Sequence, residues 1–244
     1  DEYQSKYGNI KTFYSKVKLN GSGARNKGVE ISSGEYIALL DSDDEWKHNK
    51  LLKYAKEIEH NKYKKIIYYS KLEILENSNL IKKMPLRSYD SNKESMASYI
   101  FGVAGFIQTS TIVLRKEDYQ NIKFNDQFIR HQDYDFCIRA DKLGYDFYFI
   151  PEELTIYNIQ GRSNSKRKGE STIYSHWWLN SMRPYLSDSD LNCYKSFKLP
   201  HKLKSDGKKI KAILCFFYCF MKTSLGQKKD FINFILNKVF HEKY

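Results

Sequence analysis

The segment GSGARNKGVEISSGEYIALLDSDDEW, residues 21–46, decides the fold class of this chain. Its first part carries small and apolar residues at helical spacing, with Ala24 on the side expected to be buried, and predicts a helix over residues 23–32 that Gly34 ends. The apolar run over residues 36–40 is typical of a short strand covered on both faces. A helix followed by such a strand indicates an α/β protein in which helices flank a sheet.

Three aspartates follow this strand directly: Asp41, Asp43 and Asp44. In open α/β sheets, ligands bind at the carboxyl ends of strands, so the acids have a suitable location. One of them, such as Asp44, would be enough to cap the next helix, and three within four positions favour a further role. An EF-hand loop is excluded because Trp46 stands where its turn requires Gly. Carboxylates beside a phosphate-bearing ligand favour a Mg²⁺ or Mn²⁺ ion between them, and zinc prefers other ligands.

The same alternation of strands and helices continues along the chain. The apolar runs predict strands at 10–14, 66–69, 73–75, 110–114 and 147–150. They predict one helix with Leu51, Leu52, Ala55 and Ile58 on one side, and another over 133–143. Gly144 should follow the end of the second helix, Pro151 should end the last strand, and the polar residues 161–171 should form a loop.

The net charge of +12 is concentrated in residues 195–244, which hold twelve lysines and three acidic residues. The other 194 residues are therefore close to neutral. A nucleic-acid-binding protein would interleave its basic and aromatic residues on one face, whereas the tyrosine-rich part of this chain is the nearly neutral part. We therefore expect no nucleic-acid partner and keep that class as the weakest alternative.

The lysine-rich end predicts a basic amphipathic helical tail over residues 196–244, with a boundary near residue 195. Its apolar run over residues 212–221 is far shorter than the ~20 residues that cross a bilayer. The tail could lie on an anionic membrane surface, or pack on the catalytic domain or a second subunit. The side proposed for either contact carries Phe231, Phe234, Ile235 and Val239.

Residues 21–46 resemble the nucleotide-sugar-binding core of the family 2 glycosyltransferases, in which an Ala-Arg-Asn helix precedes a strand that ends in D-x-D. That motif is Asp41-Ser42-Asp43 here. The segment RHQDYDFCIRADKLGYDFYFIP, residues 130–151, is similar to the acceptor-side segment written E-D-x-D-L, with Gln132 in place of the first acid. Residues 105–119 are similar to the strand and turn that precede it, and the whole resemblance covers about residues 10–165.

The resemblance implies a GT-A-type α/β fold with a mixed, mainly parallel sheet flanked by helices. It implies a catalytic domain over residues 1–195 that starts after the family's first strands. It also implies roles for single residues. The catalytic base would be Asp133, and the metal ligands, for Mg²⁺ or Mn²⁺, would be Asp43 and Asp41. The residues that contact the nucleotide sugar would be Ala24, Arg25, Asp41, Asp43 and Arg162.

The implied function is an inverting, metal-dependent transfer of a sugar from a nucleotide diphosphate to a hydroxyl of a glycan acceptor, which we expect to be lipid-linked, in bacterial surface polysaccharide synthesis. The scattered cysteines favour a reducing compartment, so we expect a cytoplasmic enzyme with peripheral contact to the inner face of the plasma membrane. The main alternative is a non-catalytic nucleotide-sugar-binding remnant of the same fold. For three residues a role without chemistry also stays open. Asp133 could be a first-turn acid that interacts with the helix dipole, Arg162 a solvated loop cation, and His131 a positioning or solvent-exposed side chain.

Overall fold

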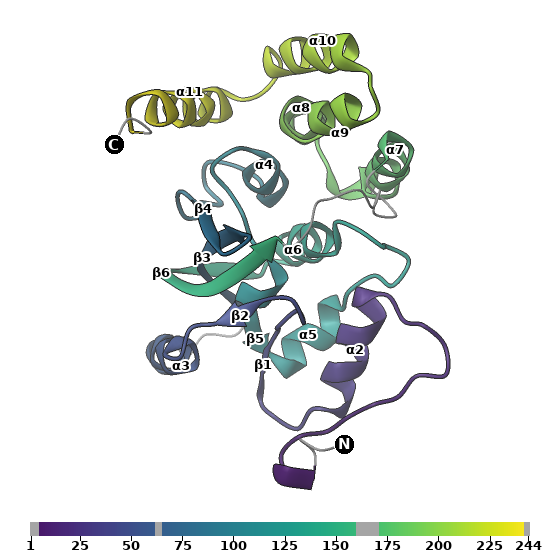
Figure 1. The fold of residues 1–244 in the computed structure, drawn as a ribbon, viewed down its shortest axis with the longest axis vertical. Coiled ribbons are helices and arrows are strands. Elements are labelled where there is room, and N and C mark those ends of the chain that lie inside the picture. The colour runs from purple at the N-terminus through teal and green to yellow at the C-terminus, as the bar shows by residue number, and fades with distance from the viewer. Residues whose placement is uncertain (1–4, 62–64, 160–170, 242–244) are drawn as a thin grey trace.

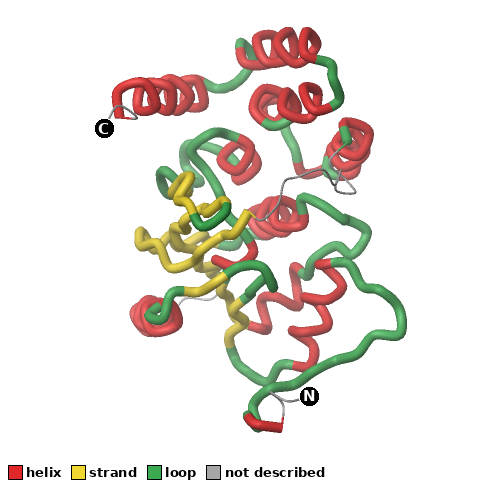
Figure 2. The backbone as a smooth tube through the Cα atoms, viewed as in Figure 1, coloured by secondary structure: helices red, strands yellow, loops and turns green. Residues whose placement is uncertain are grey.

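A computed structural model of the chain describes residues 5–61, 65–159 and 171–241. Within them, a six-stranded sheet lies between helices, and further helices extend from one end of the molecule (Figure 1). Figure 2 shows how the strands gather in one region while helices surround it. The predicted mixed α/β class is thus confirmed.

The sheet is built around two long strands, β3 (Ile66–Glu76) and β6 (Asp146–Ile159), which run parallel to each other. The order across the sheet is β1-β5-β3-β6-β2, and β4 also pairs with β3. The shorter strands are β1 (Tyr36–Ala38), β2 (Glu45–Trp46), β4 (Asn79–Met84) and β5 (Val113–Arg115). All pairs except β3–β6 among the described strands are antiparallel, so the prediction of a mainly parallel sheet is wrong. Apolar runs report that both faces of a strand are covered, and they carry no information on its direction.

One predicted strand and one predicted strand boundary are also wrong. Residues 10–14 form a largely exposed loop, with Phe13 and Tyr14 in solvent, because no described strand lies beside them to pair with their backbone. Strand β6 continues through Pro151 instead of ending there. The register between β3 and β6 shifts around Lys71, and this irregularity removes Pro151 from the ladder of hydrogen bonds that it could not donate to.

Helix α2 (Gly21–Ile31) confirms the predicted helix before β1. The side chain of Asn20 accepts a hydrogen bond from the backbone N–H of Gly23 and caps the helix. Ser22 and Val29 are its buried residues, whereas Ala24, which we expected on the buried side, is exposed. The face with Ala24 turns towards a pocket instead of the core.

Helix α3 (Lys50–His60) confirms the helix after the acidic turn but presents a different side to the protein. Lys50 and Tyr54 are buried, while Leu51 and Leu52 are exposed. Tyr54 packs in a small cluster with residues of β3, β5 and β6 on one face of the sheet. The prediction placed the wrong side inward because a tyrosine and a lysine fill the core positions here.

The larger core lies on the other face of the sheet, under α2, α4 (Met96–Phe101), α5 (Lys116–Ile122) and α6 (Gln132–Lys142). Helix α6 begins after His131, whose φ of 59° is in the left-handed region. It ends as predicted before Gly144, whose φ of 76° suits a residue without a side chain. A short 3-10 turn, η1 (Thr109–Thr111), precedes β5 where a longer strand was expected.

The last described part of the chain is helical: α7 (Thr172–Ser181), η2 (Arg183–Tyr185), α8 (Asp188–Phe197), α9 (Leu199–Ser205), α10 (Lys209–Phe220) and α11 (Leu225–His241). The helical tail was predicted for residues 196–244, and α9, α10 and α11 confirm it over the described part of that range. Helix α8 passes through residue 195, where we expected the boundary of the catalytic domain. Tyr194, Phe197 and Leu199 belong to the same core cluster as residues of α4 and α6. Among the described helices, none has both the length and the apolar character that crossing a bilayer requires.

Candidate active site

A pocket of about 720 Å³ lies between α2 and β1 and ends at the acidic turn. Ala24, Arg25, Asp41 and Asp43, four of the five residues predicted to contact a nucleotide sugar, line it. The fifth, Arg162, lies outside the described residues. The wall of the pocket changes from apolar, at Val29 and the residues of β1, to charged at its acidic end.

Arg25 connects the two motifs that the sequence places more than a hundred residues apart. Its Nε and Nη2 donate to Asp41 Oδ1 at 3.0 and 2.5 Å. Its Nη1 donates to Gln132 Oε1 at 2.7 Å. Gln132 is the position where the resembling family has an acid, and here its neutral amide oxygen takes one arm of a guanidinium that already neutralises Asp41. Gly21 leaves room for this contact, since a Cβ there would stand 2.8 Å from Gln132 Oε1.

Asp44 is buried, and its partners come from the segment before β5. Its Oδ2 accepts hydrogen bonds from Gln108 Nε2 and Ser110 Oγ, both at 2.6 Å. Burial raises the pKa of Asp44 to about 6. Asp44 does not cap α3, because the residue before that helix is Asn49. Its other oxygen, Oδ1, is buried with no hydrogen-bond partner among the described residues.

Ser110 organises the whole acidic turn. Its hydroxyl accepts from the backbone N–H of Asp41 at 2.9 Å while donating to Asp44. Its carbonyl accepts from Trp46 Nε1 and from Lys50 Nζ, at 2.9 and 3.0 Å. Lys50 is fully buried, which lowers its pKa to about 7. We did not single out Gln108, Ser110 or Lys50 from the sequence, although the polar run Gln-Thr-Ser-Thr at the entrance of an apolar strand was a usable signal.

Asp43 differs from its two neighbours because its side chain is exposed at the mouth of the pocket. No hydrogen bond or ion pair to its carboxylate is formed by any residue in the described part of the chain. Its oxygens are therefore available to a ligand from solvent, as a metal-binding role requires.

The residues fit a hard divalent cation, with a limit on their number. Among the described residues, no group of three or more His, Cys, Asp or Glu side chains could hold a metal ion. The acidic end of the pocket instead offers the free carboxylate of Asp43, with the second oxygen of Asp41 near it in sequence. One or two carboxylates are what Mg²⁺ ordinarily takes from a protein when phosphate groups of a substrate complete its shell.

Asp133 stands in the first turn of α6, close enough to Arg25 and Asp41 for their charges to act on it. Desolvation is the main cause that raises its pKa to about 6, and the backbone N–H of Tyr134 opposes the rise by donating to Oδ1 at 3.0 Å. A carboxyl group with a pKa near the operating pH suits general base catalysis. The first-turn location expected of a purely structural acid is also present, so the position alone does not decide the role.

Both carboxylate oxygens of Asp135, two residues further on, accept hydrogen bonds. Asp135 is buried, and its two oxygens accept from Arg139 Nε and Nη2 at 2.7 and 2.6 Å. This forked ion pair within α6 leaves no free oxygen for a proton from a substrate.

His131 lies in an aromatic cluster and is half-buried. Its ring stacks on Tyr134 at 5.1 Å, and its Nε2 is 3.2 Å from the hydroxyl of Tyr194 in α8. Burial lowers its pKa to about 3, so the ring is neutral at ordinary pH. It therefore positions the start of α6, as one of our two alternatives expected.

Comparisons with known proteins give one family. Residues 1–122 match the model of the family described as Glycosyl transferase family 2. The chain is 44% identical over 94% of its length to the amylovoran biosynthesis glycosyltransferase AmsB of Erwinia amylovora, of which it covers 77%. It is 32% identical over 74% of its length to an uncharacterized glycosyltransferase of Methanocaldococcus jannaschii, of which it covers 61%. The fold is similar to that of S. aureus TarS, crystallised as residues 1–349 with UDP-GlcNAc, with a TM-score of 0.55, 15% identity, and coverage of 89% of this chain and 68% of that one.

Proposed function

The chain belongs to glycosyl transferase family 2 and is a glycosyltransferase, and from that premise we propose that it transfers a sugar from a nucleotide diphosphate to a hydroxyl of a lipid-linked glycan acceptor, with inversion at the anomeric carbon. The observation that carries the proposal is the pocket between α2 and β1, whose acidic end meets the amino end of α6 through Arg25. Arg25 thereby connects the proposed donor pocket to the helix that carries the candidate base, Asp133.

The donor would lie in the pocket with its diphosphate towards the acidic end. Asp43, assisted by Asp41, would hold Mg²⁺ or Mn²⁺, which when bound neutralises charge on the departing diphosphate. Ala24 leaves space on the pocket wall, and Arg25 holds Asp41 in place while adding a positive charge near the phosphates. Arg162 would add a second cation from the segment after β6.

Asp133 would act on the acceptor. Its carboxylate takes the proton of the acceptor hydroxyl as that oxygen bonds to the anomeric carbon and the bond from that carbon to the diphosphate breaks. A single base opposite the leaving group gives inversion, because attack occurs from the face away from the diphosphate. With a pKa of about 6, Asp133 is deprotonated at neutral pH and can accept the proton without a further activating group.

The printed name of one relative supports the choice of acceptor class: AmsB is named for amylovoran biosynthesis. We propose an acceptor on the route to a bacterial surface polysaccharide, and an enzyme in the cytoplasm in peripheral contact with the anionic inner face of the plasma membrane. The division into a catalytic domain over residues 1–195 and a basic tail over residues 196–244 is part of this proposal.

A donor screen on the purified protein tests the proposal. Each nucleotide-diphosphate sugar is incubated with Mn²⁺ or with a chelator, and both nucleotide release and product anomer are measured. We expect metal-dependent release with one donor class and inversion in the product. Metal-dependent nucleotide binding without any turnover across the screen would favour the non-catalytic remnant instead. A product with retained configuration would overturn the role given to Asp133.

A further inference from the structure

Helix α10 has two apolar sides, and the described residues pack against one of them. The inner side faces α8 and α9, where Phe216 and Phe220 lie 6.3 and 6.0 Å from the ring of Phe197. Ala212 and Cys219 on the same side are buried. The packing requirement of an amphipathic helix is therefore already met by this inner side.

The other side forms what we call the α10 apolar stripe: Ile210, Ile213, Leu214, Phe217, Tyr218 and Met221. These residues recur at the spacing of one helical face, and each is more than half exposed, from 57% for Ile213 to 76% for Ile210. Single exposed apolar residues are ordinary, but six on one face form a contiguous patch of the kind that marks an interaction surface. Leu225, at the start of α11, is also exposed.

The charges around the stripe are of one sign. Lys208, Lys209 and Lys211 stand at one end and Lys222 at the other, and residues 208–222 contain no acidic residue. All four lysines are exposed. The ammonium group of Lys222 lies 4.0 Å from the ring centroid of Tyr218, so cationic and apolar groups are adjacent on this surface.

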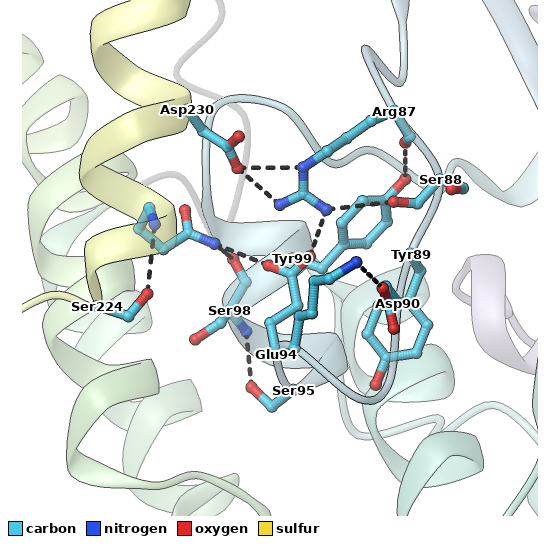
Figure 3. A network of polar contacts seen from close by, with 12 residues as sticks. Arg87, Ser88, Tyr89, Asp90, Glu94, Ser95, Ser98, Tyr99, Ser224 and Asp230 are labelled. Atoms are coloured by element: carbon cyan, nitrogen blue, oxygen red, sulfur yellow. Dashed lines mark hydrogen bonds and ion pairs between the residues drawn. The ribbon is translucent and has the colours of Figure 1, made fainter.

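A polar network holds helix α11 against the region around α4 (Figure 3). This contact also sets the direction in which the α10 apolar stripe points. Arg87 pairs with Asp230 of α11 at 2.6 Å and also with Glu94. The buried amide of Gln227 donates to Glu94 Oε2 and to the carbonyl of Ser98 at 3.0 and 2.9 Å. Because α11 is bound to the α4 region and the inner side of α10 is bound to α8, the stripe points out of the molecule. Figure 1 shows α10 at the end opposite the amino terminus.

We propose that the α10 apolar stripe docks on the surface of an anionic lipid bilayer, with the helix axis in the plane of the membrane. The exposed aliphatic and aromatic side chains suit the boundary between headgroups and acyl chains, and the flanking lysines suit anionic headgroups. A second copy of the chain fits less well, because both ends of the stripe are basic and a two-fold contact through it would place lysines of one copy against lysines of the other. This inference deepens the membrane contact of the proposed function by naming the surface that makes it.

The stripe differs from the side that the sequence suggested. Phe231 packs against Phe197, Phe216 and Phe220, with ring centroids at 5.6, 5.4 and 5.2 Å. Phe234 lies under Lys82, whose Nζ is 4.8 Å from its ring. Phe231 and Phe234 thus contact the protein, as the packing alternative expected, whereas Ile235 is exposed and the side chain of Val239 lies outside the described residues.

The stripe is also connected to the candidate acceptor side. Helix α8, which packs on α10, carries Tyr194, whose hydroxyl meets His131 beside Asp133. Lys198, which follows α8, places its Nζ 5.9 Å from the ring of Tyr134. A membrane bound at α10 would therefore hold the start of α6 at a fixed height above the lipid surface.

Vesicle flotation tests the inference without any turnover, so that its failure and a failure of the proposed transfer reaction are distinguishable. The full chain is floated with vesicles of phosphatidylcholine alone and with vesicles that contain phosphatidylglycerol, at low and high salt. We expect binding to the anionic vesicles and its weakening by salt. The variant Leu214→Ser/Phe217→Ser should lose at least tenfold in apparent affinity, and Lys209→Gln/Lys211→Gln should lose about fivefold for each lysine.

The matched control is Leu51→Ser/Leu52→Ser, which changes two equally exposed apolar residues on α3. We expect this control to bind vesicles as the unchanged chain does, and near-identical melting temperatures would show that all variants are folded. Equal flotation of the stripe variant and the unchanged chain would overturn the inference. So would a concentration-dependent dimer, in the absence of lipid, that the stripe variant abolishes, because the stripe would then bind a second copy.

Discussion

The two acidic segments of the site, residues 41–44 and 133–135, are alike in sequence, but their carboxylates have different partners in the folded protein. In the first, Arg25 binds Asp41 and Ser110 binds Asp44, which leaves Asp43 exposed. In the second, Arg139 binds Asp135, whereas the carboxyl group of Asp133 accepts from the backbone N–H of Tyr134 and has a raised pKa. The acids with side-chain partners build the site, and the one left in each segment is the candidate for chemistry. What differs is the surroundings: solvent around Asp43 suits a ligand to a cation, and a desolvated location suits a base.

The strongest test of this comparison is Asp133→Asn, for which we expect a loss of about 10³-fold in kcat. The amide keeps the hydrogen bond to Tyr134 but cannot accept the acceptor's proton, so donor affinity should change little. Steady-state assays of sugar transfer measure kcat, and calorimetry measures the affinity for the donor. Asp146→Asn, an exposed acid at the start of β6, is the control. Near-normal turnover of Asp133→Asn would place the base elsewhere.

The second acid of the same segment should behave in the opposite way. Asp135→Asn leaves Arg139 without its forked partner beside the core, and we expect the free energy of unfolding to fall by about 2–3 kcal/mol. Denaturant titration measures this loss. Turnover per folded molecule should stay within a few-fold of the unchanged chain. A folded, stable Asp135→Asn protein that has lost transfer would reverse the assignment of the two acids.

The sequence supported the fold of this region because its signals are local. Periodicity gave α2 and α6, and Gly144 marked the end of α6, since each depends on residues within a few positions. The contact of Arg25 with Gln132 could not be predicted in the same way, because a glutamine at an expected acidic position names no partner. The burial of Lys50 could not be predicted either, because lysines are usually exposed to solvent. Its partners, the carbonyl of Ser110 and the hydroxyl of Thr155, come from distant parts of the sequence.

For the first segment we expect Asp43→Ala to lower the metal-dependent affinity for a nucleoside diphosphate by at least tenfold, about 1.4 kcal/mol. The fold should be unaffected because this side chain is exposed. Calorimetry with Mn²⁺ and with a chelator separates the metal-dependent part from the rest. Glu45→Gln, an exposed acid two residues away, should bind as the unchanged chain does. Unaltered metal dependence in Asp43→Ala would remove it as a ligand.

The smallest expected effect concerns the link between the segments. Arg25 lowers the pKa of Asp133 and Asp41 raises it. Arg25→Met should therefore move the acid limb of the kcat/KM profile to higher pH, and Asp41→Asn should move it to lower pH. In the unchanged chain the rate should fall as pH drops through about 6, where Asp133 takes up a proton. Shifts in the same direction for both variants would show general damage instead of charge coupling.

The close contact between Gly102 and Gln227 limits how this protein can be recombined with its relatives. A Cβ at residue 102 would stand 2.2 Å from Gln227 Oε1, so any larger residue at this position requires the buried amide of Gln227 to move away from the loop after α4. A chimaera that takes its carboxyl-terminal helices from another family member inherits half of this contact. Grafts should therefore exchange residues 87–105 together with the tail, because the two segments form one exchangeable unit although 121 residues of chain lie between 105 and 227.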